Sequence, residues 1–244
     1  GGNLAEVCNS ELGMAYIPAE NRLSAGEVLD CCIAENAMKM EHDGPTCMGF
    51  DVGKTFHVVI AEKPSDRRLR VVKLARVSGE NDVYDLGKRY NVAFAVCDKY
   101  PETRLARKMS ENMSFPLFLC GYQDGKKKGV TDWSDVTKEI VGNRTELCDA
   151  SHELIISAGL ELPRVGDEVK EFAKQVCNMA KVLQEDEETG AKNYIYRKLG
   201  ADHYRHALNY LMLASERTGT TSSLKVIANF WRRRRRPGRT AMTV

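Results

Sequence analysis

The stretch that decides the fold is residues 46–77, TCMGFDVGKTFHVVIAEKPSDRRLRVVKLARV. Three segments within it are rich in apolar and β-branched residues and favour strands, at residues 46–52, 56–62 and 69–77. Turn-forming residues separate the segments, Gly53-Lys54 after the first and Pro64-Ser65-Asp66 after the second. Turns as short as these join neighbouring strands that run in opposite directions. The stretch therefore predicts a meander of three antiparallel strands.

Helix and strand patterns alternate in the segment that follows the meander. Residues 83–90 and 102–113 have helical spacing, the second with apolar residues at every fourth position. Residues 92–97 and 116–122 are nearly continuous apolar runs, which are typical of strands buried on both faces. A meander followed by this alternation predicts an α/β fold, with a mixed sheet of three antiparallel strands and then parallel strands, flanked by helices.

Beyond residue 122 the spacing of apolar residues predicts mostly helices. We expect them at residues 132–141, 143–159, 169–183 and 202–214, with a short strand at residues 194–199. Upstream of the meander, Ser24 and Glu27 have the spacing of a capping box and predict one further short helix. These helices are the elements expected to cover the sheet.

Length and composition fit an ordinary globular protein. The chain has 244 residues, 43% hydrophobic and 29% charged, which is too apolar for a disordered protein. No apolar run is long enough to cross a bilayer and the N-terminus has no signal-peptide pattern, so we expect no membrane contact. Eight cysteines without a C-x-x-C pair favour reduced thiols in a reducing cytosol. The chain does not begin with Met, which indicates a processed chain or an excised domain.

Charge is distributed unevenly along the chain. The formal net charge of +2 comes from 36 basic and 34 acidic residues. Six arginines lie near the C-terminus, and without them 30 basic residues stand against 34 acidic ones, a net charge of −4. This distribution argues against nucleic-acid binding over the whole surface and leaves a localised basic contact open.

Two aspartates come directly at the ends of predicted buried strands. Asp51 ends the first strand of the meander, and Asp98 follows the apolar run at residues 92–97. Ligands of open α/β sheets bind at the carboxyl ends of the strands. Two carboxylates that meet there repel each other unless they share a proton or bind a cation, and Mg²⁺ is the natural cation for oxygen ligands. Either aspartate alone is best interpreted as a turn residue, whereas the pair favours a metal site.

Asp202 is a third candidate, at the start of the last predicted helix. Asp is a preferred residue at the N-cap of a helix, and this role would be sufficient to explain it. The alternative is that Asp202 completes a site of three carboxylates, with His206 one turn further along the same side of the helix. The pattern alone leaves these two interpretations even. His203 and His206 are best interpreted as ordinary residues of the polar face of the helix.

His57 lies in the second strand of the meander. A two-residue turn at Gly53-Lys54 would pair Asp51 with Phe56 and place His57 on the other side of the sheet. A longer connection would shift the register and bring His57 to Asp51. We favour the first arrangement, with His57 as a partly exposed strand histidine outside the site.

Three blocks of the sequence resemble a known family. They are MGFDVG at residues 48–53, VCDKYPE at residues 96–102 and GADHYRHALNY at residues 200–210. Together they resemble the nuclease domain of the large terminase subunit of tailed bacteriophages, and the last block is the most specific. Residues 9–16, NSELGMAY, resemble the segment that links the ATPase domain to the nuclease domain in this family. The resemblance implies a linker segment at residues 1–45 after a missing ATPase domain, a nuclease domain at 46–215 and a flexible Arg-rich tail at 216–244.

The resemblance implies a ribonuclease H-like fold and a metal-dependent endonuclease. The implied reaction is two-metal cleavage of double-stranded, concatemeric viral DNA during genome packaging. Carried over by position, Asp51, Asp98 and Asp202 are the implied catalytic and metal-binding acids for two Mg²⁺ or Mn²⁺ ions. Asp51 would bridge the two ions, and each of the other two acids would complete the shell of one ion. Some members of the family have a further acid after the last one, where this chain has His203.

Further residues are expected to assist the three acids or to contact DNA. Lys54 beside Asp51 is a candidate contact for the scissile phosphate or an ordinary surface lysine, and the possible auxiliary residues are Lys54, His57, His203 and His206. Two basic clusters are candidate DNA contacts, each with a solvated surface segment as the alternative. The clusters are Lys126, Lys127 and Lys128, and Arg232, Arg233, Arg234, Arg235 and Arg236.

The implied partners are double-stranded DNA, the terminase ATPase domain of a full-length chain, the portal protein and the small terminase subunit. The implied location is the cytoplasm of the infected bacterial host. Two alternatives stay open. One is a non-catalytic module that docks on DNA or the portal, and the other is another ribonuclease H-like nuclease, such as a junction resolvase.

Overall fold

A computed structural model describes residues 22–123, 131–185, 190 and 192–219. The strands of its main sheet are β1 Thr46–Asp51, β2 Phe56–Ser65, β3 Arg68–Val77, β4 Val92–Asp98, β5 Leu117–Tyr122, β6 Asp132–Ser134, β7 Glu139–Gly142 and β8 Leu160–Glu161. These eight strands lie in the order β6-β7-β5-β4-β1-β2-β3-β8. The helices are α2 Ala25–Leu29, α3 Glu80–Arg89, α4 Thr103–Asn112, α5 Arg144–Ile156, α6 Asp167–Val176 and α7 His203–Glu216.

The predicted meander forms the centre of the sheet. β1 pairs antiparallel with β2, and β2 pairs antiparallel with β3. On the other side of β1 the pairing is parallel, first to β4 and then from β4 to β5. All six residues of β1 are buried, as expected for a central strand with packed layers on both faces. The predicted fold class, a mixed sheet flanked by helices, is confirmed.

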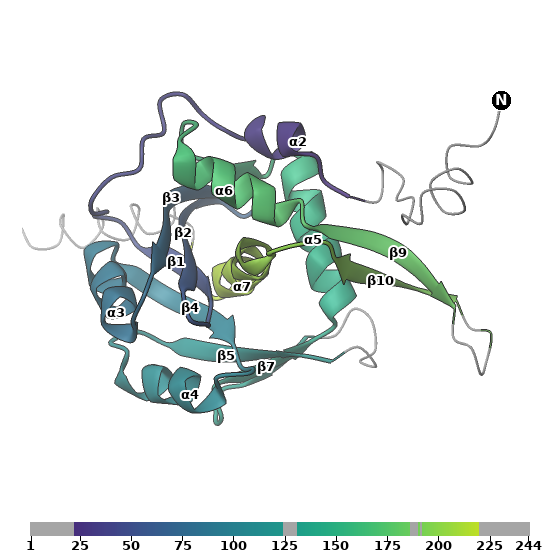
Figure 1. The fold of residues 1–244 in the computed structure, drawn as a ribbon. Helices are drawn as coiled ribbons and strands as arrows, with labels where there is room; N and C mark the ends of the chain where they lie inside the picture. The colour runs from purple at the N-terminus through teal and green to yellow at the C-terminus, as the bar shows by residue number, and fades with distance from the viewer. Residues whose placement is uncertain (1–21, 124–130, 186–189, 191, 220–244) are drawn as a thin grey trace, which may run out of the picture.

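Helices cover both faces of the sheet and bury a separate apolar core against each. The residues of α3 and α4 pack against one face, where Val83 and Met109 belong to the core. α5, α6 and α7 pack against the other face, where Phe172 and Leu208 belong to the core. Figure 1 shows the two layers, with α3 and α4 on one side of the strands and α6 and α7 on the other. The short helix α2 joins the second layer, and Ser24 and Glu27 form the predicted capping box at its start.

The central helix α7 packs unusually close to β1. A Cβ atom added to Gly49 would lie 2.1 Å from the backbone nitrogen of Leu211 and 2.2 Å from the carbonyl oxygen of Ala207. Only glycine leaves room for this approach of helix to strand. Because side chains alternate along a strand, Asp51 points to the same face as Gly49, which is the face that α7 covers. The close packing thus sets the position of Asp51 relative to α7.

The prediction of a helix at residues 132–141 is wrong. These residues form the hairpin of β6 and β7 at the edge of the sheet, next to β5. Trp133, Val136 and Ile140 imitate helical spacing in the sequence, but they do not share one buried face. Val136 is 96% exposed, whereas Ile140 is buried within the sheet. The backbone turns just before β7 at Lys138, which has a positive φ of 52°.

The predicted helix at residues 169–183 is correct only in its first part. α6 ends at Val176, and the chain continues as β9 (Met179–Glu185), which pairs antiparallel with β10 (Lys192–Lys198). The strand expected at residues 194–199 is confirmed as β10. The helix ends where Asn178 donates its side-chain amide to the carbonyl oxygen of Ala201, at the entry to α7. The ribbon of β9 and β10 extends away from the layered body (Figure 1).

Several predicted features lie outside the described residues. They are the linker block at residues 9–16, the lysines at 126–128 and the arginine-rich segment at 232–236. The seven cysteines that the structure describes are free, in agreement with the expectation of reduced thiols. Within the described ranges, no helix is both long enough and apolar enough to span a bilayer.

Candidate active site

Asp51 and Asp98 lie side by side at the carboxyl edge of the sheet. β1 and β4 are parallel neighbours with Phe50 opposite Cys97, so the next residue of each strand is one of the two aspartates. Both aspartates line a cavity of about 300 Å³. The other lining residues are Tyr100, Tyr122, Arg144, His206 and Tyr210. The structure therefore brings together the first two predicted acids as the strand ends implied.

Asp98 is a buried carboxyl group beside a second acid. Its side chain accepts a hydrogen bond from the backbone N–H of Val52 at 2.6 Å, and the residue is only 6% exposed. Burial, together with the negative charge of Asp51, raises the pKa of Asp98 to about 8. Asp98 therefore keeps a proton near neutral pH, at a place where a cation could bind instead.

Asp202 occupies the N-cap position of α7, but its side chain does not cap the helix. Its Oδ1 lies 2.7 Å from Nζ of Lys198, and its Oδ2 lies 3.4 Å from Nε2 of His206. Burial alone would raise the pKa of Asp202, but hydrogen bonds from His206 and Lys198 outweigh it and lower the pKa to about 2. The residue is 3% exposed. Capping therefore does not explain this aspartate.

His206 connects Asp202 to the cavity of the other two acids. It lies on α7 with one ring nitrogen toward Asp202, and its Nδ1 lies 3.0 Å from the hydroxyl of Tyr122 at the end of β5. The same histidine lines the cavity that Asp51 and Asp98 share. Asp202 is thus linked to the site through His206, although it does not itself line the cavity.

His203 and His57 gather around Asp51. Nδ1 of His203 lies 2.7 Å from Oδ2 of Asp51, and this hydrogen bond raises the pKa of His203. The rings of His57 and His203 stack with centroids 4.7 Å apart. Burial, and then the neighbouring His203, lower the pKa of His57. Asp51, His57 and His203 each offer a ligand atom, and these atoms lie within 4.8 Å of one another.

The expectation that His57 is partly exposed and remote from Asp51 is wrong. The connection between β1 and β2 comprises residues 52–55 rather than two residues, and it places His57 directly opposite Asp51. The histidine is 6% exposed. Lys54 lies in this connection as an exposed residue and does not line the cavity of the acids.

Arg144 is a site residue that the sequence patterns did not reveal. It is the first residue of α5, directly after the N-cap Asn143, and it lines the cavity with Asp51 and Asp98. Its Nε is buried and has no hydrogen-bond partner among the described residues. β7 runs parallel to β5, so the residues after it reach the same edge of the sheet. Recognising β7 as a strand would have pointed to Arg144, but its segment resembles a helix.

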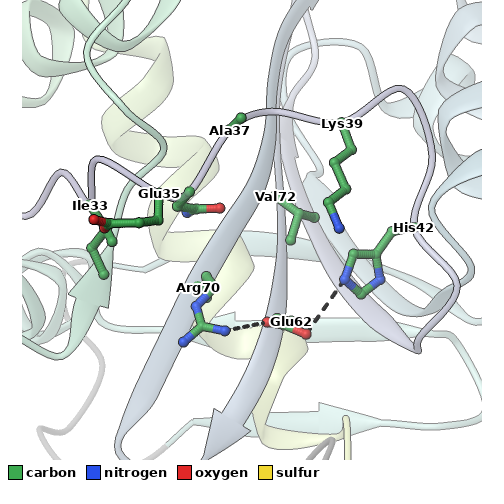
Figure 2. A pocket seen from close by; sticks show the side chains of 9 residues that line it. Ile33, Glu35, Ala37, Lys39, His42, Glu62, Arg70 and Val72 are labelled. Carbon is green, nitrogen blue, oxygen red and sulfur yellow. Dashed lines mark hydrogen bonds and ion pairs between the residues drawn. The ribbon is translucent and has the colours of Figure 1, made fainter.

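A second cavity, of about 400 Å³, lies away from the acids and is shown in Figure 2. The chain near Lys39 and His42 passes over β2 and β3 there (Figure 2). Three of its charged or titratable groups are paired, because Glu62 lies 3.0 Å from the guanidinium of Arg70 and 3.5 Å from the ring of His42. Glu62 lies toward the far end of β2 from His57. Asp51, Asp98 and Asp202 do not line this cavity.

The strand order and the acids at its carboxyl edge define the class of this protein, an α/β protein of ribonuclease H-like fold. No family model matches the chain, and no curated protein matches it in sequence. Solved structures do match. The large terminase nuclease from thermophilic phage G20c has a TM-score of 0.51 at 15% identity, over 80% of this chain and 99% of that one. The same nuclease with bound magnesium has a TM-score of 0.50 at 16% identity, over 80% and 98%.

The nuclease domain of the large terminase subunit gp2 of bacterial virus Sf6 also matches. Its TM-score is 0.51 at 11% identity, over 78% of this chain and 97% of that one. The chain therefore has the fold of phage large terminase nuclease domains over about four fifths of its length. The family resemblance predicted from the three sequence blocks is confirmed at the level of the fold.

Proposed function

We propose that the chain is a metal-dependent endonuclease that cleaves double-stranded DNA. The observation that supports this most is the edge of the sheet, where Asp51 and Asp98 share one cavity and Asp202 reaches it through His206. Asp98 in particular is buried beside Asp51, and no ion pair with a described residue offsets its charge. Burying carboxyl groups costs free energy unless they are paired or bind a cation.

The residues present fit divalent cations that prefer oxygen ligands. Asp51 would be shared between two ions, with Asp98 and Asp202 each completing the shell of one, and Mg²⁺ or Mn²⁺ are the proposed ions. Two such ions would activate water and stabilise the charge on the leaving oxygen of a phosphodiester. The proton of Asp98 would leave when a cation enters, as metal binding to carboxylates requires.

Arg144 is proposed to hold the phosphate of the substrate. Its guanidinium belongs to the same cavity as the two adjacent acids, and guanidinium groups suit phosphate oxygens because they donate two parallel hydrogen bonds. The Nε of Arg144 has no hydrogen-bond partner among the described residues and would donate one of these hydrogen bonds. Lys54 is exposed in the connection after β1 and would contact DNA outside the cavity. Further DNA contacts are proposed for the lysines at 126–128 and the arginines at 232–236, which lie outside the described residues.

The proposed substrate is concatemeric viral DNA during genome packaging. The likeness to the G20c and Sf6 terminase nucleases supports this substrate, and one of those structures contains magnesium. In that setting the chain would act with a terminase ATPase domain, the portal protein and the small terminase subunit, in the cytoplasm of the infected bacterium. These assignments go beyond the site itself, whose geometry supports phosphodiester hydrolysis in general.

Cleavage of a supercoiled plasmid tests the proposal. With Mn²⁺ or Mg²⁺ the wild-type chain should nick and linearise the plasmid, and EDTA should abolish the reaction. Asp51→Asn, Asp98→Asn and Asp202→Asn should each reduce the rate more than about 100-fold, since even outer-shell partners of metal ligands are worth 10- to 100-fold. Asp66→Asn is the matched control, because this aspartate is 87% exposed in the turn between β2 and β3.

Two results would contradict the proposal. One is cleavage by Asp51→Asn or Asp202→Asn at the wild-type rate. The other is DNA binding that weakens with salt but is never followed by metal-dependent cleavage, which would support a non-catalytic docking module. A panel of nicked, linear and branched DNA would show whether the enzyme is instead specific for junctions.

A further inference from the structure

A site made of three acids alone does not explain why the imidazole of His203 lies next to Asp51. His203, the first residue of α7, places Nδ1 2.7 Å from Oδ2 of Asp51. An octahedral cation with bonds of about 2.1 Å holds neighbouring ligand atoms about 3 Å apart. The nitrogen and the oxygen are therefore already spaced like two adjacent ligands of one ion.

His57 has a different role, which follows from its hydrogen bonds. Oε1 of Gln175 accepts a hydrogen bond of 3.0 Å from the backbone N–H of Tyr204. The other side-chain atom of Gln175, Nε2, is therefore the amide nitrogen and donates hydrogen bonds. This Nε2 lies 3.3 Å from Nε2 of His57. His57 therefore accepts at Nε2 and is a neutral imidazole with its proton on Nδ1. Nδ1 of His57 is buried with no hydrogen-bond partner among the described residues, and in this tautomer it carries the proton, so it would bind a cation only after a change of tautomer.

His57 instead fixes the ring of His203. The two rings stack at an interplanar angle of 16° with centroids 4.7 Å apart. Gln175 connects the two elements that carry these rings. It contacts His57 on β2, and it accepts a hydrogen bond from Tyr204 in the first turn of α7. The ring of His203 is thus held from the strand and from the helix. Groups that orient a ligand in this way tune both its direction and its affinity for the metal.

We infer that His203 donates Nδ1 to the divalent cation at Asp51, with His57 as its positioning residue, and that this site prefers a first-row transition-metal dication to Mg²⁺. The inference rests on the proposed function only for placing a cation at Asp51. Mg²⁺ takes oxygen ligands and keeps several waters. An imidazole nitrogen in place of an oxygen shifts the preference toward transition metals.

Pulsed electron paramagnetic resonance of Mn²⁺ bound to the full chain tests the inference without DNA. Electron spin echo modulation should show a ¹⁴N coupling from a directly bound imidazole in the wild type. The coupling should persist in the control His152→Asn, which changes a histidine on α5, and in His57→Phe, which keeps a ring for stacking. It should disappear in His203→Asn and His203→Asp. Circular dichroism of each metal-free variant shows that it is folded.

Calorimetric titration with Mn²⁺ and with Mg²⁺ gives the second readout. His203→Asn should lower the affinity for Mn²⁺ relative to Mg²⁺ by about tenfold or more. His203→Asp, which replaces the nitrogen by an oxygen, should restore the affinity for Mg²⁺ but not the preference for Mn²⁺. A coupling that survives in His203→Asn, an unchanged Mn²⁺ to Mg²⁺ ratio, or no binding of Mn²⁺ would each overturn the inference.

The two proposals fail in different ways. A wild-type chain that shows the nitrogen coupling but never cleaves plasmid would contradict the nuclease and leave the inference about His203 standing. A wild-type chain that cleaves plasmid without any nitrogen coupling would contradict the inference and leave the nuclease standing.

Discussion

Gly49→Ala should destabilise the protein and disable the site together. The added Cβ would lie 2.1 Å from the backbone nitrogen of Leu211 and 2.6 Å from its Cα, where ordinary contacts are about 3.5 Å or longer. These are backbone atoms that cannot rotate away, so β1 and α7 must separate by about 1 Å or more. Overpacking of this kind costs about 1–3 kcal/mol and occasionally more. Alanine is favoured over glycine within a strand by only about 0.5–1 kcal/mol, so we expect a net loss of about 1–2 kcal/mol.

The same separation of β1 from α7 should also lower the rate of DNA cleavage. β1 ends with Asp51, and α7 begins beside Asp202, so moving one element from the other changes the spacing of the acids. A misplacement of about 1 Å in a catalytic site can cost about 100-fold in rate. Plasmid cleavage by Gly49→Ala should fall by that order at a temperature where circular dichroism shows the variant to be folded.

Urea denaturation followed by circular dichroism measures the free energy of unfolding. Gly26→Ala is the control, because its nearest neighbour would be Oγ of Ser24 at an ordinary 3.8 Å. This glycine lies within α2, where alanine is the better helix former, so the control should be neutral or slightly stabilising. A Gly49→Ala variant whose free energy of unfolding lies within about 0.5 kcal/mol of wild type, which is about one measurement error, would refute the packing argument.

Three further predictions address other parts of the molecule. Arg144→Gln should lower kcat/KM for plasmid cleavage about 10- to 100-fold, because it removes a hydrogen bond from a charged group. Arg144→Lys should lower kcat/KM less, and the control Arg104→Gln, at an exposed position, should leave it unchanged. Burial raises the pKa of the Cys47 thiol to about 12, so only about one in 10,000 such thiols is ionised at pH 8. After iodoacetamide treatment of the folded chain, mass spectrometry should find the partly exposed Cys32 modified and Cys47 unmodified. Cys47 should react only once urea unfolds the chain. Equal rates of modification of Cys32 and Cys47 in the folded chain would contradict this prediction. Ser24→Ala removes the capping box of α2 and should cost about 1 kcal/mol in urea denaturation, whereas an unchanged midpoint would show that the cap contributes nothing.

The centre of the fold could be predicted because its signals are local. β1 and β4 are apolar on both faces, so their sequences identify them as central strands without knowledge of their neighbours. Each is followed by an aspartate, and the topology rule for open sheets then places Asp51 and Asp98 together. The periodicity of the sequence thus suffices for these two acids, and for the helix that follows Asp202.

The errors arose where the structure depends on pairing between distant segments. Residues 179–185 continue the apolar spacing of α6, but they pair with β10 and become a strand, since tertiary contacts override a weak local preference. Asp51 pairs with His57 instead of the expected Phe56, and this shift of one residue brings His57 to the face of the sheet that carries Asp51. Pairing between strands sets both features, so the local sequence pattern does not reveal them.

The charge of the site is the property that sequence could least reveal. Three aspartates at one edge suggest a uniformly negative surface, but their surroundings differ. Asp202 is paired with Lys198 and His206, and its pKa is lowered to about 2, whereas burial beside Asp51 raises the pKa of Asp98 to about 8. One acid is thus ionised through its cationic neighbours, and the other keeps its proton near neutral pH. This difference arises from burial and from the junction of β10 with α7, so a count of carboxylates in the sequence would overstate the negative charge at this edge of the sheet, where the proposed DNA substrate would bind.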